Sequence, residues 1–286
     1  RQSYRWSDLD FEANINEGIG IDWPIRYKDI EPWYRYVESF IGVSGENAGL
    51  KQLPDQVLMP HHELNCLERH CKESIENHYD DRKMIAARVA VLTQPHNGRG
   101  ACMSRNMCSR GCPYGAYFSS NSSTLPAAAK TGNMTLRPHS VVHSIIYNDK
   151  TNRAEGVNVI DAETGETHEY FAKIVFLCAS TLATTQILMN SANSSFPNGF
   201  ANSSGVLGHY LMDHLEGAYT GGTYDGFSDK YYHGRKPNGM YIPRFRNVNR
   251  KDGDFYRGYA FECYSSRANW ERGRQVPGIG ADFKEM

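Results

Sequence analysis

Three cysteines lie close together in one stretch of the sequence, and a group of thiolates is a natural metal ligand set. They are Cys102, Cys108 and Cys112, with Pro113 directly after the last. Sulfur is a soft ligand, and Cys-x3-Cys-Pro is the ending of the cysteine run in bacterial ferredoxins. Three thiols suit an iron–sulfur cluster that lacks one iron corner, whereas zinc with His96 as fourth ligand lacks the paired Cys-x2-Cys. Ordinary buried thiols in a tight loop remain the alternative.

Two smaller groups also combine residues that could do chemistry. His62, Cys66 and His70 are spaced four residues apart, which places them on one stripe of a helix, but charged neighbours favour an exposed helix over a metal site. Asp213 and His214 resemble an acid–base pair. Adjacent residues of an extended segment point to opposite faces, so we expect a structural role for this pair.

Glycine motifs that hold phosphates are incomplete in this chain. The segment 18–23 begins Gly-Ile-Gly but breaks off before the third glycine of a dinucleotide-binding turn. The sequence also has no Gly-x-Ser-x-Gly and no P-loop lysine. Hydrolase and nucleotide-triphosphatase functions therefore have no support.

Helices and strands that would position these residues can be read from periodicity. A helix is expected to start near Asp29, because Trp33, Val37 and Phe40 follow at helical spacing. Residues 61–95 predict a helix followed by a strand-like segment at 87–92. Residues 125–132 predict a short helix that ends at a glycine.

The most regular part of the chain predicts three consecutive strands. They are expected at 134–148, 153–161 and 169–178, with turn-forming residues between them. The run Ile174–Cys178 is continuously apolar, as in a strand buried on both faces, and it leads through Ala179 and Ser180 into a helix at 182–191. Residues 215–286 are rich in Gly, Tyr and Arg and suggest antiparallel sheet with long loops.

Composition excludes several classes of protein. The 286 residues carry 31 basic and 32 acidic side chains, a net charge of −1, which argues against a nucleic-acid groove. No stretch approaches about 18 uninterrupted apolar residues, so no membrane span is expected. Seven cysteines are too few, and odd in number, for a disulfide-stapled scaffold.

The ends of the chain suggest an internal piece of a longer protein. The sequence opens at Arg1 without a methionine or an apolar signal segment, and it stops at Met286 without a terminating element. A processed mature protein is the alternative.

Several segments in succession resemble one family. The order is the cysteine loop with its Cys-Pro-Tyr-Gly-Ala ending, then 125–128, the strands with Ala-Glu-Gly-Val at 154–157, then 179–191 and 207–214. This succession resembles the glucose–methanol–choline (GMC) oxidoreductases, with the gluconate dehydrogenase-like and pyranose oxidase-like branch as the nearest. Each motif alone is weak, and the order makes the resemblance specific.

The resemblance implies a mixed α+β and α/β fold. Part of a Rossmann-like FAD-binding domain with a β-meander would be interleaved with a substrate domain built on an antiparallel sheet. Residues 1–23 would then be a flavin-domain segment and 24–95 substrate-side or lid material. Residues 96–214 would return to the FAD-binding domain, and 215–286 would begin the substrate sheet.

The resemblance further implies hydride transfer from the CH–OH group of a sugar or alcohol to FAD. Expected FAD contacts are Val142, on a strand that meets the adenine, Ala179 and Ser180 at the turn before the helix, and Thr184 one turn later. The glycine fingerprint would precede Arg1 and the catalytic histidine would follow Met286, so no catalytic residue is assigned here, and the 286 residues alone are expected to be inactive.

The cysteine spacing resembles the three-iron loop of membrane-associated bacterial FAD glucose dehydrogenases. Cys102, Cys108 and Cys112 would then hold a [3Fe–4S] cluster that passes electrons to a cytochrome or small-subunit acceptor. Two alternatives of other classes are an iron–sulfur electron-transfer module without flavin and a non-catalytic, aromatic-rich carbohydrate-binding domain.

Overall fold

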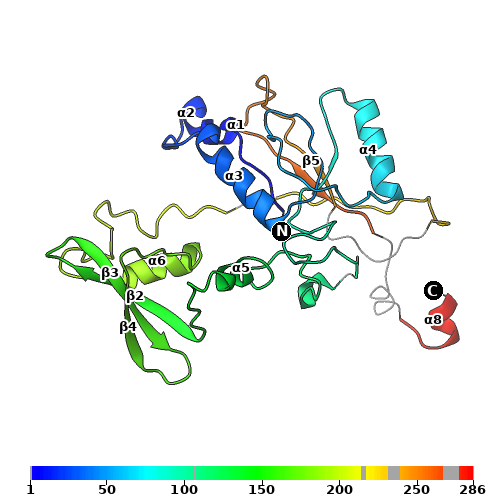
Figure 1. The fold of residues 1–286 in the computed structure, drawn as a ribbon. Coiled ribbons are helices and arrows are strands. Elements are labelled where there is room, and N and C mark those ends of the chain that lie inside the picture. Colours follow the sequence, from blue (N-terminus) through cyan, green and yellow to red (C-terminus); the bar gives the residue numbers. More distant parts are fainter. Residues whose placement is uncertain (1, 106, 214–216, 231–238, 267–276, 286) are drawn as a thin grey trace. The chain divides into compact units, whose positions relative to one another are not determined.

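The computed structural model divides into two compact units, shown in Figure 1. Unit 1 comprises 1–133 with 224–286, and unit 2 comprises 134–223. The structure describes residues 2–105, 107–213, 217–230, 239–266 and 277–285.

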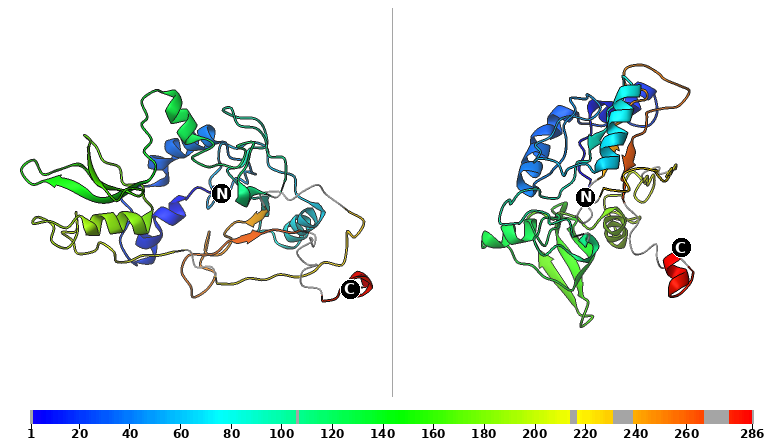
Figure 2. Two further views of the ribbon diagram at one scale, coloured as in Figure 1. Left: turned by 90° about the horizontal axis from the view of Figure 1, so that it is seen from below. Right: turned by 90° about the vertical axis from the view of Figure 1, so that its right-hand side faces the viewer.

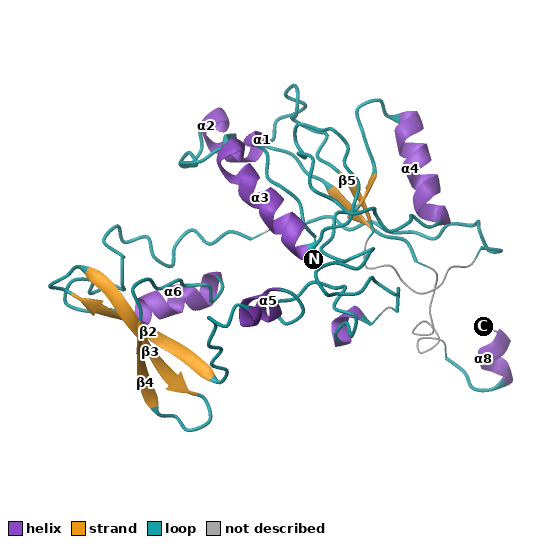
Figure 3. Ribbon diagram, in the orientation of Figure 1, coloured by secondary structure: helices purple, strands orange, loops and turns teal. Residues whose placement is uncertain are grey.

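Unit 1 combines helices with a small antiparallel sheet and long loops (Figure 3). Its elements are α1 (Asp8–Phe11), α2 (Ala13–Glu17), α3 (Tyr27–Ile41), α4 (Cys66–His78), β1 (Ile85–Ala86), the 3-10 helix η1 (Cys108–Arg110), α5 (Thr124–Lys130), β5 (Met240–Ile242), β6 (Phe261–Cys263) and α8 (Ala281–Glu285).

The core of unit 1 is the segment 84–92, which is buried at every position. Its first part forms β1, which pairs with β5, and β5 pairs with β6. The segment predicted to be strand-like at 87–92 forms isolated bridges, Ser44 with Val89 and Val91 with Tyr117, rather than a continuous ladder. This segment therefore packs the interior without being part of the sheet along its whole length.

The helix predicted from Asp29 onward is confirmed as α3, although it begins two residues earlier. Asp29 accepts a hydrogen bond from the backbone N–H of Arg26 at 2.8 Å, so it caps the first turn. The apolar stripe that predicted the helix lies largely at the surface, since Trp33 and Val37 are exposed. The one buried side chain of α3 is Glu38. The short helix predicted at 125–132 is also confirmed, as α5.

Unit 2 is a three-stranded antiparallel meander with one helix packed against it. It contains β2 (Ser140–Asn148), β3 (Arg153–Asp161), β4 (Thr167–Phe171) and α6 (Thr181–Asn190). The helix packs along β2 (Figure 2), where Ser191 Oγ accepts a hydrogen bond from the Ile145 N–H at 2.8 Å. Gly156 on β3 is required by close packing, because a Cβ there would lie 2.2 Å from the carbonyl oxygen of Tyr170.

The prediction of a strand buried on both faces at 174–178 is wrong for this structure. The third strand ends at Phe171, and no strand pairs with the apolar run among the described residues. Exposure alternates along the run: Ile174 and Phe176 are 68% and 82% exposed, while Val175 and Leu177 are half-buried. The run is therefore covered on one side by unit 2, and its other side faces solvent.

The assignment of segments to a flavin domain and a substrate domain stays a prediction. In the described part of 215–286, β5 and β6 are antiparallel and separated by long loops, as the composition suggested. The cysteine loop belongs to the same unit as 1–95, whereas the meander and α6 form the other unit. Among the helices described, we find none with the length and apolar character needed to span a bilayer.

Candidate flavin and metal sites

The turn that leads into α6, where two of the expected FAD contacts lie, has an unusual backbone conformation. Ser180, the N-cap residue, has φ of +74°, a left-handed conformation that is rare for residues other than glycine. Its side chain does not cap the helix. Ala179, Ser180 and Thr181 are exposed, so the first N–H groups of this ten-residue helix lie at an open surface. Such an N-terminus favours an anionic group.

The other two residues expected to contact FAD belong to the same unit. Thr184 lies in the first turn of α6 and donates its N–H to the Ser180 carbonyl at 2.9 Å. Val142 lies on β2, half-buried and opposite Val159, next to a register irregularity that follows it in the ladder. All four expected residues therefore fall within the meander–helix unit.

The cysteine loop folds over the core of unit 1. Cys102 and Cys112 both pack against the cluster of Val89, Val91, Leu92 and Ala116, and Cys108 begins η1. None of the seven cysteines forms a disulfide. Within the described chain, no three His, Cys, Asp or Glu side chains form a group that could hold a metal ion. The structure thus lends the metal centre no support, and it stays a prediction from the spacing.

Cys112 nevertheless has surroundings that favour its anionic form. Burial raises the pKa of its thiol, but the backbone N–H groups of 114–117, which point at the sulfur, outweigh burial and bring the net pKa below the ordinary value. A turn of converging N–H groups of this kind stabilises a negative charge.

His96, considered above as a fourth zinc ligand, has a structural partner. A ring nitrogen lies 2.8 Å from the Ser39 carbonyl, while Asn97 donates to the Phe40 carbonyl at 2.9 Å. Arg99 donates to the carbonyl of Ile41. Three successive carbonyls at the C-terminus of α3 are therefore capped from one loop, and the cationic Arg99 lies at the negative end of the helix.

The two smaller groups do not form sites in the described chain. The helix α4 begins only at Cys66, so His62 lies outside it and the predicted stripe does not exist. His70 instead approaches Tyr224, with 3.2 Å between ring nitrogen and hydroxyl. Asp213 is described, but its neighbour His214 lies outside the described residues.

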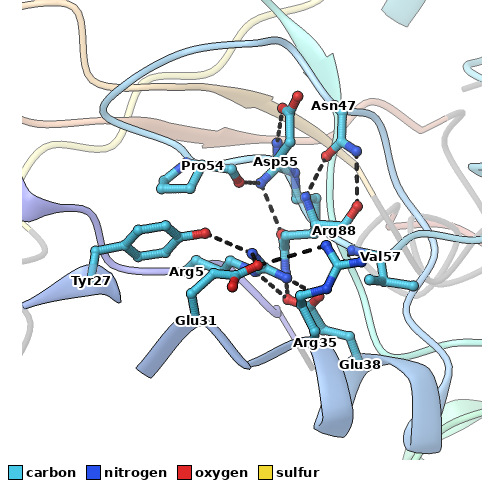
Figure 4. A network of polar contacts seen from close by, with 11 residues as sticks. Arg5, Tyr27, Glu31, Arg35, Glu38, Asn47, Pro54, Asp55, Val57 and Arg88 are labelled. Atoms are coloured by element: carbon cyan, nitrogen blue, oxygen red, sulfur yellow. Dashed lines mark hydrogen bonds and ion pairs between the residues drawn. The ribbon is translucent and has the colours of Figure 1, made fainter. Parts of the chain in front are cut away.

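A buried polar network in unit 1 was missed by the sequence analysis (Figure 4). Arg5 donates to Glu38 through two nitrogens, at 2.8 and 2.6 Å, and to the Tyr27 hydroxyl at 2.6 Å. Gln56 links Glu38 to Arg88, which is fully buried. Every one of these side chains has a hydrogen-bonded partner, so we assign the network to the architecture of unit 1. Nothing in the sequence of the amphipathic helix α3 indicates that Glu38, a charged residue, is the one that is buried.

The part of the chain that is similar to known proteins includes both the cysteine loop and the meander–helix unit. A family model for GMC oxidoreductases matches residues 21–216. The chain is 32% identical over 219 residues to 2-methyl-1,2-propanediol dehydrogenase of Mycolicibacterium austroafricanum, which covers 74% of this chain and 38% of that protein. It is 28% identical to the fructose dehydrogenase large subunit of Gluconobacter japonicus, over 74% of this chain and 39% of that one.

A third relative is the 6'''-hydroxyparomomycin C oxidase of Streptomyces lividus, 26% identical over 78% of this chain and 41% of that protein. The chain thus spans about two fifths of the length of the curated relatives it matches. It belongs to the GMC oxidoreductase family, a family of FAD-dependent enzymes.

Proposed function

We propose that this chain is the central part of an FAD-dependent oxidoreductase that acts on the CH–OH group of an alcohol or sugar. The family match over 21–216 carries the proposal, because it includes both the cysteine loop and the meander–helix unit. Flavin, when bound, accepts a hydride from the alcohol carbon. A flavin-free iron–sulfur module and a carbohydrate-binding domain do not account for the same match.

The FAD contacts in this proposal are Val142, Ala179, Ser180 and Thr184. Support comes from the open first turn of α6, whose N–H groups can donate to a phosphate or a hydroxyl, and from the small exposed side chains of Ala179 and Ser180, which allow close approach. The left-handed backbone at Ser180 is the kind of local strain that proteins retain at ligand sites. The backbone of Val142 would meet the adenine.

Two parts of the enzyme have no counterpart in these 286 residues. There is no complete glycine fingerprint, and no histidine matches the family's catalytic motif. We propose that further polypeptide supplies the first βαβ unit and the general base. The apolar run 174–178, in which Ile174 and Phe176 are exposed in this structure, would then pair with strands of that unit, within a Rossmann-like sheet whose faces are covered by helices.

The segment assignment is part of the same proposal. Residues 1–23 and 96–214 would belong to the flavin domain, 24–95 to the substrate side and lid, and 215–286 to the start of the substrate sheet. The antiparallel pairing of β5 with β6 supports the last assignment.

A flavin-binding experiment tests the proposal. A longer polypeptide that includes both missing parts should hold stoichiometric FAD, and the flavin should bleach when a diol, fructose or an aminoglycoside is added anaerobically. In that protein, Ala179→Glu should lower flavin content at least about tenfold, because the larger, charged side chain would fill the space that Ala179 leaves for the cofactor. Ala162→Glu, at the exposed β3–β4 turn of the same unit, is the matched control.

The 286-residue chain alone should bind FAD weakly. The pyrophosphate of a dinucleotide normally rests on a helix N-terminus reached through the glycine turn, and that turn is missing here. Stoichiometric flavin retained through gel filtration by this chain would refute the need for the missing βαβ unit.

The [3Fe–4S] cluster on Cys102, Cys108 and Cys112 is a finer proposal, together with a cytochrome or small-subunit acceptor. The spacing of the three cysteines supports it. Iron and sulfide analysis of anaerobically purified longer protein decides it: about three irons per flavin are expected, Cys112→Ser should lose them, and Cys178→Ser, at an exposed cysteine, should not. Absence of iron would reduce the loop to a structural role.

A further inference from the structure

Two cysteines outside the cysteine loop lie in a common environment, although they are far apart in the sequence. Cys71 on α4 and Cys263 on β6 both pack against the buried cluster of Leu64, Met84, Ala86 and Met240. Both are half-buried and neither is in a disulfide. The family-specific cysteine loop includes neither of them.

The backbone around the two cysteines holds their elements together. Asn65, the N-cap of α4, donates its side-chain amide to the Ser265 carbonyl at 3.2 Å and accepts from the Ser265 hydroxyl at 3.0 Å. Ser265 is two residues beyond Cys263, and Cys71 lies in the second turn of α4. Cys263 is in register with Met240 of β5, itself a member of the shared cluster. The start of α4 is therefore fixed beside the end of β6.

The electrostatics of the two thiols agree with their packing against one buried cluster. Burial raises the pKa of Cys263, and the next cause is the charge of Cys71, followed by Glu262. Burial, then Glu68, raises the pKa of Cys71. Burial is thus the main cause for both thiols, as expected of side chains that pack against the same buried cluster.

We propose that Cys71 and Cys263 form a reversible disulfide that fastens β6 to α4, with a small disulfide such as oxidised glutathione as the oxidant. One thiolate attacks the oxidant's S–S bond and releases one glutathione thiolate, giving a mixed disulfide. The second thiolate then attacks the protein sulfur of the mixed disulfide and releases the second glutathione. The protein loses two electrons and two protons, and the oxidant becomes two molecules of glutathione.

The link would add a covalent connection to a part of unit 1 that has a short β-ladder. In the described residues, β5 joins β1 through only two residue pairs, Ile85 with Tyr241 and Ala86 with Met240. A disulfide between α4 and β6 closes a very long loop, and long loops gain most from such closure in the chain-entropy model. The oxidised protein should therefore unfold at a higher temperature than the reduced protein.

Peptide mapping of the wild-type protein tests the proposal without any variant. After equilibration with excess oxidised glutathione, blocking of remaining thiols and tryptic digestion, the peptide 70–72 should be joined to 258–267, and reduction should separate them. Trypsin cuts after Arg69, so Cys66 falls in a different peptide and serves as the control thiol of the same helix. Five residues along a helix place Cys66 on another face from Cys71, and it should be recovered alkylated or as a glutathione adduct.

Thermal unfolding provides a second readout. Oxidation should raise Tm by at least about 4 °C, reversed by dithiothreitol. Cys71→Ser and Cys263→Ser should each abolish the rise, and Cys66→Ser should retain it. Recovery of Cys71 and Cys263 as separately alkylated or glutathionylated peptides, or a link from either to a different cysteine, would overturn the proposal.

Discussion

Glu38 is a buried carboxylate of unit 1 that accepts four hydrogen bonds. Its oxygens accept from two nitrogens of Arg5, from the Gln56 amide and from the Val57 N–H, and the residue is only 5% exposed. Removing the charge of Glu38 should therefore destabilise the folded protein strongly, because the Arg5 cation would remain buried without its counter-charge.

Glu38→Gln should therefore lower the free energy of unfolding by about 3 kcal/mol. Urea unfolding of the 286-residue chain, followed by far-UV circular dichroism, measures the change. Arg35→Gln is the matched control on the same helix. Arg35 pairs with Glu31 at the surface at 3.6 Å, so its loss should cost less than about 0.5 kcal/mol. Equal effects of the two substitutions would contradict the importance of the buried network.

Ionisation of Tyr241 should lower the free energy of unfolding at alkaline pH. Burial, then the carboxylates of Glu262 and Asp10, raises its pKa to about 12, with Arg88 opposing. An ordinary tyrosine has a pKa near 10, so folding favours the neutral phenol. The stabilisation is fully present below about pH 10 and is lost as pH rises toward about 12.

Tyr241→Phe should consequently lessen the fall in unfolding free energy between pH 10 and 12 by on the order of 2 kcal/mol. Urea midpoints measured at half-unit steps of pH give the comparison, with Tyr36→Phe, an exposed tyrosine, as control. Parallel curves for wild type and Tyr241→Phe would exclude this ionisation as a cause of alkaline unfolding. Stacking of Tyr241 on Tyr4, with 4.2 Å between centroids, is retained by phenylalanine.

At the scale of elements, the C-terminus of α3 depends on the loop that follows the buried core segment. Asn97 both donates to the Phe40 carbonyl and adopts φ of +48°. These two roles can be separated. Glycine adopts the left-handed backbone without strain but lacks the hydrogen bond, whereas alanine lacks the hydrogen bond and is strained in that conformation.

Asn97→Gly should cost about 0.5–1 kcal/mol for the lost hydrogen bond, and Asn97→Ala about 1 kcal/mol more for the strained backbone. Urea unfolding of both variants gives the two increments. If alanine proved no worse than glycine, the left-handed backbone would not matter to stability. Gly98→Ala is the control. Gly98 also has a left-handed backbone, and a Cβ there would contact no other atom, so this substitution tests backbone strain alone.

On the scale of the whole molecule, the apolar run 174–178, with Ile174 and Phe176 exposed, is the feature by which the proposed Rossmann-like sheet can be tested. Phe176→Ser should change the unfolding free energy of this chain by less than about 0.5 kcal/mol, because Phe176 is 82% exposed. In the longer polypeptide the same substitution should cost about 3 kcal/mol or more, because the ring would be buried between strand and covering helix.

Tyr219→Ser, at an 84% exposed residue of the same unit, is the control and should be near neutral in both proteins. Unfolding of each pair by urea, with the longer protein in its flavin-bound form, supplies the four values. A small effect of Phe176→Ser in both proteins would mean that no further strand covers the run.

The sequence by itself determined the local elements of this protein. The helix around Trp33, the meander with its two turns and the helix after Ser180 were predictable because periodicity and turn residues act over a few neighbours. The ordered succession of motifs also predicted the family. Spacing alone could not decide whether three thiols converge, because a loop that rich in glycine and serine can fold in many ways.

Only the tertiary structure decided which side chains are buried. Glu38 is buried and Trp33 is exposed, the opposite of what their polarity predicts. Burial of Glu38 is possible because Arg5 and Gln56, from distant segments of the sequence, donate hydrogen bonds to its carboxylate. The apolar run at 174–178 has the composition of an interior strand, yet burial requires neighbours on both sides, and the described chain provides them on one side only. The composition of a segment shows whether it can be buried, and the neighbours that the fold places around it determine whether it is buried.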